Sequence, residues 1–193
     1  MRLSRRMVVN GERSFSETTE TRSFDVATQT YRYTNASPSN AWATAGTIDT
    51  TSPVENYVGH KTGDSGVETS TILINLGSYA YDGDSIKLLA KFYAYAPSIN
   101  FQTKGFQWAL CSSQANRDLY KGQTAVTSDP YQIVSGTSTF TYDNGGYEYN
   151  TLTIDSDAIP SDTDLFLFLW PNGTYTDVAH IRDNVDIEFH YYN

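Results

Sequence analysis

Apolar and polar residues alternate with a period of two along much of the chain, and the clearest case is the segment 84–97. Its alternate positions form two sets, Ile86, Leu88, Ala90, Phe92 and Ala94 in one, and Lys87, Leu89, Lys91, Tyr93 and Tyr95 in the other. This alternation, with both lysines in the second set, is typical of an antiparallel strand that buries one face and exposes the other.

Three further segments strengthen the β-rich pattern. The segment 69–78 is predicted to be a strand with Ile72, Ile74 and Leu76 on one face. The segment 184–193 is predicted to direct Val185, Ile187, Phe189 and Tyr191 inward, and Asp186, Glu188, His190 and Tyr192 outward. Residues 164–171 are apolar on both faces, which predicts a central strand that is covered on both sides.

The spacing of these segments indicates the fold class. From residue 53, predicted strands follow one another at intervals of about 8–12 residues, separated by turns rich in Gly and Asp such as 60–68 and 81–85. Helical periodicity is absent. Strands with turns and almost no helix predict an all-β protein, an antiparallel β-sandwich of jelly-roll type that occupies residues 51–193.

An aromatic cluster lies around the turn 143–146. The segments 131–142 and 147–154 are predicted to form a hairpin there, because Asn144 and the two following glycines supply positive-φ positions. Residues two apart in a strand lie on one side, so the hairpin would bring four rings to a single face. These rings are Phe140, Tyr142, Tyr147 and Tyr149.

Two interpretations of this aromatic face remain open. The rings could cover the core, in which case a bulge near Asn150 is needed to return Leu152 and Ile154 to the buried face. They could instead form an exposed platform for a sugar or a protein, since the tyrosine side chain is flat and amphipathic and loses little conformational entropy on binding. The outer tyrosines of the segment 84–97, Tyr93 and Tyr95, are candidates for the same role, and the alternative is that a second element of the fold covers them.

Residues 1–50 differ from the rest of the chain. They are polar, rich in Thr, Ser and Arg, and contain too few apolar residues to form a core of their own. We expect an extended N-terminal arm and linker that gains order by adding strands to the sheet edge of another subunit. A solvated, disordered leader is the alternative. Trp42 stands alone in the linker 35–46 and docks either on its own domain or on a partner.

The distribution of charge supports the distinction between arm and body. The chain has a formal net charge of −9. Residues 1–35 hold six arginines and four acidic residues, a net of +2, so the remaining 7 basic and 18 acidic residues give −11. A basic arm on an acidic body is typical of an interaction segment, which makes Arg2, Arg5 and Arg6 candidates for partner contacts. The acidic balance argues against nucleic acid and against an anionic membrane surface as partners.

Cysteine content and apolar runs indicate where the protein is made. No secretory signal peptide is recognisable, and no window approaches the ~20 apolar residues of a membrane span. The single cysteine, Cys111, excludes an intrachain disulfide. We therefore expect a soluble protein made in a reducing host cytoplasm, which reaches the outside only when a cell is lysed, as virus particles do.

No catalytic motif is present. Cys111 lies in an apolar stretch and is predicted to be a buried, inert thiol. The three histidines lack partners at metal-ligand spacing. The acidic pairs lie in turns, where aspartate is common for turn chemistry alone, although clustered carboxylates also suit a structural calcium ion. These pairs are Asp82 with Asp84, Asp155 with Asp157, Asp162 with Asp164, and Asp183 with Asp186. We expect no enzyme activity and no required cofactor.

The sequence resembles two families in its pattern of residue types. The alternating segment DGDSIKLLAKFYAYAP (82–97) and the final segment NVDIEFHYYN (184–193) resemble jelly-roll carbohydrate-binding modules. The N-terminal stretch MRLSRRMVVNGERSFSETTETRSF (1–24) resembles the anchoring arm of tailed-bacteriophage virion proteins. The phage resemblance implies a non-enzymatic structural component of a head or tail, bound to itself and to other virion proteins, with host-surface glycan as a further partner. A free-standing carbohydrate-binding module is the alternative.

Overall fold

The computed structural model describes residues 3–9, 13–33, 42–44, 69–80, 86–95, 102–120, 126, 128–142, 147–156, 159–172 and 180–192, and for some strand positions in these ranges it describes the backbone alone. Eleven strands and two short 3-10 turns make up the described regular structure. The turns are η1 (Val26–Thr28) and η2 (Arg117–Leu119). Neither is long enough to cross a membrane, and the described residues contain no other helix.

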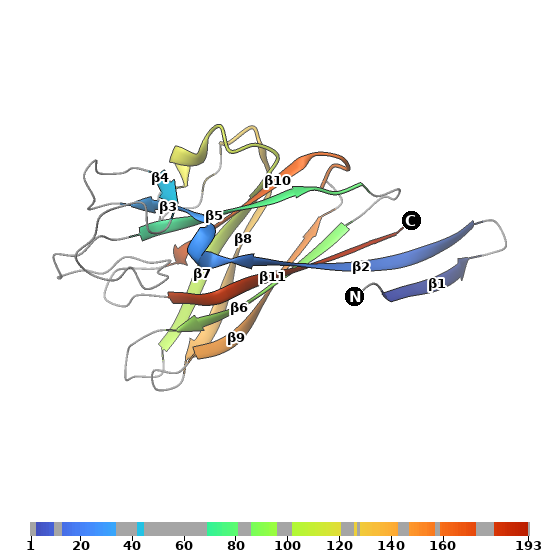
Figure 1. Ribbon diagram of the computed structural model, residues 1–193, viewed down its shortest axis with the longest axis horizontal. Coiled ribbons are helices and arrows are strands. Elements are labelled where there is room, and N and C mark those ends of the chain that lie inside the picture. Colours follow the sequence, from blue (N-terminus) through green and yellow to red (C-terminus); the bar gives the residue numbers. More distant parts are fainter. Residues whose placement is uncertain are drawn as a thin grey trace.

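The strands form two antiparallel sheets (Figure 1), which confirms the predicted all-β sandwich. Sheet A has the order β1 (Leu3–Val9), β2 (Arg13–Asp25), β11 (His180–Tyr192), β6 (Ile86–Tyr95), β9 (Tyr147–Ser156). Sheet B has the order β4 (Trp42–Thr44), β3 (Thr30–Tyr33), β5 (Thr69–Ser78), β10 (Asp164–Asn172), β7 (Gln102–Cys111), β8 (Gln132–Tyr142).

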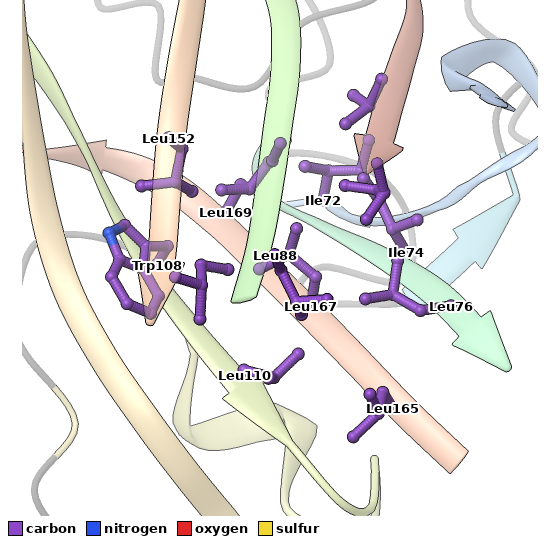
Figure 2. Close-up of a cluster of buried hydrophobic side chains, with 14 of the residues drawn as sticks. Ile72, Ile74, Leu76, Leu88, Trp108, Leu110, Leu152, Leu165, Leu167 and Leu169 are labelled. Carbon is purple, nitrogen blue, oxygen red and sulfur yellow. The ribbon is translucent and has the colours of Figure 1, made fainter. Parts of the chain in front are cut away.

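The main core lies between the two sheets (Figure 2) and follows the predicted alternation. In the central parts of β5, β10 and β11 alternate residues are buried there, and so are Leu88 and Ala90 of β6, while Lys91 is half-exposed. Four strands contribute three core residues each: Ile72, Ile74 and Leu76 from β5; Phe106, Trp108 and Leu110 from β7; Leu165, Leu167 and Leu169 from β10; and Val185, Ile187 and Phe189 from β11. Each fully buried aliphatic side chain contributes roughly 1.5–3 kcal/mol, so this layer is the main source of stability.

Sheet B is covered on its outer face as well. The alternate residues of β10, Phe166, Phe168 and Trp170, belong to a second buried cluster outside the sandwich. Tyr120, from the connection between β7 and β8, stacks on Phe168 with ring centroids 4.2 Å apart. The prediction that residues 164–171 form a central strand covered on both sides is therefore confirmed, and the covering segment belongs to this chain.

The predicted hairpin of residues 131–142 with 147–154 is wrong. β8 pairs with β7 in sheet B, whereas β9 pairs with β6 in sheet A. The chain thus crosses between the two sheets at 143–146, residues that lie outside the described structure. No bulge is needed, because the register of β6 with β9 runs without a shift and directs Leu152 and Ile154 into the core. The four aromatic residues therefore do not share one face: Phe140 and Tyr142 lie in sheet B, Tyr147 and Tyr149 in sheet A.

The N-terminal segment also differs from the expected arm. β2 pairs with β11 over nine residues of sheet A, and β3 and β4 join sheet B beside β5. Residues 17–33 and 42–44 thus take their order from their own chain, and the division at residue 50 does not separate them from the sandwich. The part that extends away from the body is shorter: β1 and the first residues of β2, at the right of Figure 1.

A polar inner face explains why β2 was assigned to the arm. The core-side positions of β2 are Thr18, Glu20, Arg22 and Phe24, of which Thr18 is buried. The Arg22 guanidinium lies 3.8 Å over the centre of the Tyr79 ring and donates to the Leu76 carbonyl at 3.3 Å. Glu20 pairs with Arg22 at 2.8 Å. Because aliphatic stems and a cation–π contact replace an apolar stripe, the alternation of β2 is not visible in its sequence.

Candidate functional site

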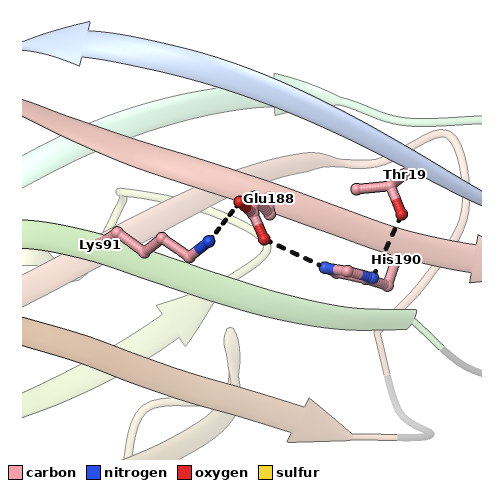
Figure 3. A network of polar contacts seen from close by, with 4 residues as sticks. All are labelled: Thr19, Lys91, Glu188 and His190. Carbon is pink, nitrogen blue, oxygen red and sulfur yellow. Dashed lines mark hydrogen bonds and ion pairs between the residues drawn. The ribbon is translucent and has the colours of Figure 1, made fainter. Parts of the chain in front are cut away.

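The outer face of sheet A carries a network of polar side chains from three strands (Figure 3). Lys91 of β6 forms a short ion pair with Glu188 of β11, and the second Glu188 oxygen lies 3.4 Å from His190 Nε2. His190 Nδ1 in turn lies 3.3 Å from the Thr19 hydroxyl of β2. The register places Lys91 opposite Asp186, so Lys91 reaches Glu188 as its diagonal neighbour. The network ties β6, β11 and β2 together across the face.

The electrostatics of this network keep the Glu188 carboxyl group in its charged form. The hydrogen bond from Lys91 is the main cause that lowers the pKa of Glu188, with the charges of Lys91 and His190 acting in the same direction against a smaller effect of burial. A general acid needs a pKa raised toward the working pH. Glu188 has the opposite shift, so it is a fixed negative charge and a hydrogen-bond acceptor at neutral pH.

Within the described residues, nothing covers this face. Thr21, Ser23 and Thr153 are exposed, and Asp186 accepts a hydrogen bond from the Ser23 hydroxyl at 2.6 Å. The outer face of sheet B, by contrast, is buried beneath Tyr120. Of the two outer surfaces, the polar face of sheet A is therefore the one that the described part of the chain leaves accessible to a ligand.

Strand pairing brings tyrosine positions together at one end of this sheet. In the register of β6 with β9, Tyr93 is the partner of Tyr149, and Tyr95 is the partner of Tyr147. The predicted hairpin hid this neighbourhood, because it made Tyr147 and Tyr149 the partners of residues 140 and 142 instead of residues in β6. The side chains of these four tyrosines lie outside the described structure, and their role as a ligand surface stays a prediction.

Trp42 docks on its own chain. Its indole N–H donates to Asp118 at 2.8 Å, and its ring meets Phe168 edge-on with centroids 6.2 Å apart. The Arg117 guanidinium lies 5.5 Å from the same ring. Of the two alternatives for this tryptophan, the structure supports self-docking, with the ring half-buried against sheet B. For the arm candidates, Arg5 and Arg6 have backbone positions in β1 and undescribed side chains, and Arg2 lies outside the described residues.

A buried polar network secures the segment that covers sheet B. The Tyr120 hydroxyl donates to Asp129 Oδ2 at 2.8 Å and lies 3.0 Å from Cys111 Sγ. Asp129 Oδ1 accepts from Asn116 Nδ2 at 2.9 Å and from the Tyr131 backbone N–H at 3.0 Å. Burial raises the pKa of Cys111 to about 12, so the thiolate that a nucleophile requires is absent at neutral pH. The prediction that this thiol is buried is confirmed, and its inertness stays a prediction.

The acidic turns hold no metal-binding cluster among the residues that the structure describes. Asp162 and Asp164 are exposed, and Asp162 has φ +54° with its N–H donating to the Tyr79 carbonyl at 2.8 Å. Aspartate tolerates this left-handed conformation, which accounts for its presence in the turn. Each remaining acidic pair has at least one side chain outside the described residues, so calcium at those turns stays a prediction.

Comparison with known proteins gives no family. No protein-family model matches the chain, and no curated protein matches it. Among solved structures, it is similar to the crystal structure of dimeric latent PorU from Porphyromonas gingivalis, with a TM-score of 0.40 and 10% sequence identity. That alignment covers 96% of this chain and 13% of the PorU chain. A TM-score of this size does not establish a shared fold.

Proposed function

We propose that the chain is a non-enzymatic structural subunit of a larger assembly, attached by the hairpin of β1 and β2. A tailed-phage virion, at the head or tail, is the assembly that the sequence favours, with other virion proteins as partners. The observation that carries the proposal is the extension of the hairpin past the end of β11. Among the described strands, residues 13–16 of β2 pair only with β1, since β11 pairs with β2 only from Glu17 onward.

The geometry of the hairpin suits strand addition. Four residues of strand reach roughly 14 Å, so the paired ends of β1 and β2 at Val9 and Arg13 stand clear of the sandwich at the right of Figure 1. Among the described strands, none pairs with the outer edge of β1. An open strand edge presents unpaired N–H and C=O groups, and adding it to another molecule's sheet is a common mode of protein association. The attachment segment is thus much shorter than the arm of 50 residues that the composition indicated.

Deletion of residues 1–16 tests this function. The cut keeps every residue of β2 that pairs with β11, so the sandwich is expected to stay folded and soluble. Assembly is expected to be lost, measured as molar mass by light scattering alone and in the presence of the natural particle components. A control with Arg13→Ala in the full chain keeps the hairpin and should assemble. Unchanged assembly after the deletion, with the fold intact by circular dichroism, would refute the proposal.

A second candidate function is glycan binding on the outer face of sheet A. The observation that favours it is the pairing of tyrosine positions 93 with 149 and 95 with 147, next to hydrogen-bonding groups of Lys91 and Glu188. Tyrosine rings stack on sugar rings, and charged or hydroxyl side chains beside them bind sugar hydroxyls. The module would act either alone or as the host-contacting face of the particle subunit.

Substitution of the tyrosines tests glycan binding. Tyr93→Ala and Tyr95→Ala should each weaken binding to any glycan retained on an array by tenfold or more, about 1.4 kcal/mol. Tyr131→Ala is the matched control, since Tyr131 is 40% exposed and directly precedes β8 of the other sheet. A glycan array on which the wild-type chain binds no glycan would count decisively against this function.

A further inference from the structure

We infer that β1 of one molecule adds to β9 of a second copy of this chain, so that sheet A continues from one subunit to the next. This inference rests on the proposed function and names the partner of the hairpin. In the order β1-β2-β11-β6-β9, these two strands form the opposite ends of sheet A. Within the described part of the chain, no strand pairs with the outer edge of either.

Both edges carry charged residues but lack three other features that normally prevent association. Exposed edges are usually protected by proline, by bulges or by being very short. β1 and β9 contain 7 and 10 residues without proline. Their pairings with β2 and β6 run without any register shift. The edges of sheet B are better protected, because β4 has only 3 residues and the pairing of β8 with β7 is interrupted near Cys111.

Charge disfavours pairing of either edge with itself. Antiparallel self-pairing of β1 over its whole length sets Arg6 opposite Arg6. Antiparallel self-pairing of β9 over its whole length sets Glu148 opposite Asp155, twice in each dimer. Like charges directly opposite each other destabilise a strand pair. A two-fold dimer through either edge is therefore disfavoured.

Pairing of β1 with β9 replaces the repulsion between like charges with attraction between opposite charges. β1 carries Arg5 and Arg6 and no acidic residue, whereas β9 carries Glu148 and Asp155 and no basic residue. The same contrast holds for the larger segments. Residues 1–17 contain four arginines and two glutamates, 4 − 2 = +2, so the remaining 9 basic and 20 acidic residues give 9 − 20 = −11. Attraction between a basic edge and an acidic body also speeds association.

The topology determines the form of the assembly. Sheet A has five strands with antiparallel neighbours, so β1 and β9 run in the same direction. Joining them with the outer faces on one side gives a parallel strand pair at each junction. The contact uses two different surfaces, so it repeats head to tail and forms either a closed ring or an open filament. Every subunit then presents its polar outer face on the same side of the assembly.

A charge exchange tests the inference. The hairpin variant R5E/R6E and the edge variant E148K/D155K should each reduce the molar mass from that of the wild-type oligomer to the monomer value of 21.6 kDa. The chain that carries all four substitutions should recover the oligomer, as should an equimolar mixture of the two double variants, in which each basic edge meets an acidic one. A wild-type chain that stays monomeric at its highest soluble concentration overturns the inference, as does failure of the fourfold variant to recover.

A capping experiment gives an independent answer if a charge variant does not fold. The chain that lacks residues 1–16 keeps β9 but cannot donate β1, so excess of it should terminate wild-type oligomers and lower their mean mass at least twofold. The same truncated chain with E148K/D155K should leave the mass unchanged. If hairpin deletion abolishes assembly but E148K/D155K does not, the hairpin binds a different partner: the β9 inference falls while the proposed function stands. If hairpin deletion has no effect, both fall.

Discussion

The indole of Trp108 lies directly against Gly136, its cross-strand partner in β7 and β8. A Cβ atom added at Gly136 would fall 2.6 Å from Cζ2 and 2.9 Å from Cε2 of that ring. Trp108 is 7% exposed and belongs to the main core, so the ring has little freedom to retreat. The glycine therefore makes room for the tryptophan at the edge of sheet B.

We expect Gly136→Ala to destabilise the protein by about 1–3 kcal/mol, the usual cost of overpacking a core. Urea denaturation followed by tryptophan fluorescence measures this change. Thr137→Ala, at the exposed neighbouring position, is the control and should change stability by less than about 0.5 kcal/mol. In the background Trp108→Leu the cost of Gly136→Ala should largely disappear, and a cost that persists there would contradict this explanation.

Tyr120→Phe should destabilise the fold through its lost hydroxyl. The hydroxyl donates to Asp129, which is 8% exposed, so its removal leaves a buried carboxylate with one donor fewer. The expected loss is about 1–3 kcal/mol by chemical denaturation. Tyr131→Phe serves as the matched control because that side chain is 40% exposed. Equal effects of the two substitutions would show that the buried network contributes nothing specific.

The thiol of Cys111 should resist alkylation as long as the protein is folded. It is fully buried, and burial raises its pKa to about 12. At pH 8 the fraction of thiolate is then lower than that of a free cysteine by roughly 10³-fold. Mass spectrometry after iodoacetamide treatment should detect modification only in urea. Rapid modification of the native chain would mean that the segment over sheet B opens readily.

The ion pair of Lys91 with Glu188 should make stability depend on pH. The folded state lowers the pKa of Glu188 from its ordinary value of 4.5, so the carboxylate form favours folding. This stabilisation is present above about pH 4.5 and is lost as the pH falls through the lower folded-state pKa. Glu188→Gln should therefore cost about 1 kcal/mol or less at pH 7, and the difference from wild type should shrink as the pH falls below 4.5. Asp164→Asn, at an exposed carboxylate, is the control, and a difference that grew on acidification would contradict the assignment.

The sequence predicted the strands whose buried positions are occupied by apolar residues. β5, β6, β10 and β11 carry alternating or continuous apolar positions, and the structure buries those faces. The pairing of β2 with the sandwich was not predicted, because Thr18 and the stem of Arg22 occupy its inner face in place of apolar residues. The contact of the Arg22 guanidinium with the Tyr79 ring joins two distant segments, so it leaves no pattern in the sequence of β2. The inner face of β2 is recognisable only from its pairing with β11, because its residues lie opposite the buried residues of that strand.

The candidate site was still less accessible to sequence analysis. Glu188 and His190 stand two residues apart, a spacing that predicts a shared outward face, but Lys91 joins them only through the register of β6 with β11. The hairpin prediction failed for a related reason. A short turn with Asn and two glycines favours local pairing, yet in the fold it joins strands of opposite sheets, and the tyrosines of β9 thereby become partners of β6.

The path of β2 has a mechanical consequence. β2 lies along β11 for nine paired positions and then passes through η1 into β3 of the other sheet. Hydrogen bonds between antiparallel strands run perpendicular to the strand axis. A pull on the N-terminal hairpin along that axis would therefore strain all nine positions in shear at once, where a perpendicular pull would unzip them one by one. A subunit tethered in this way could carry tension along its length without unravelling.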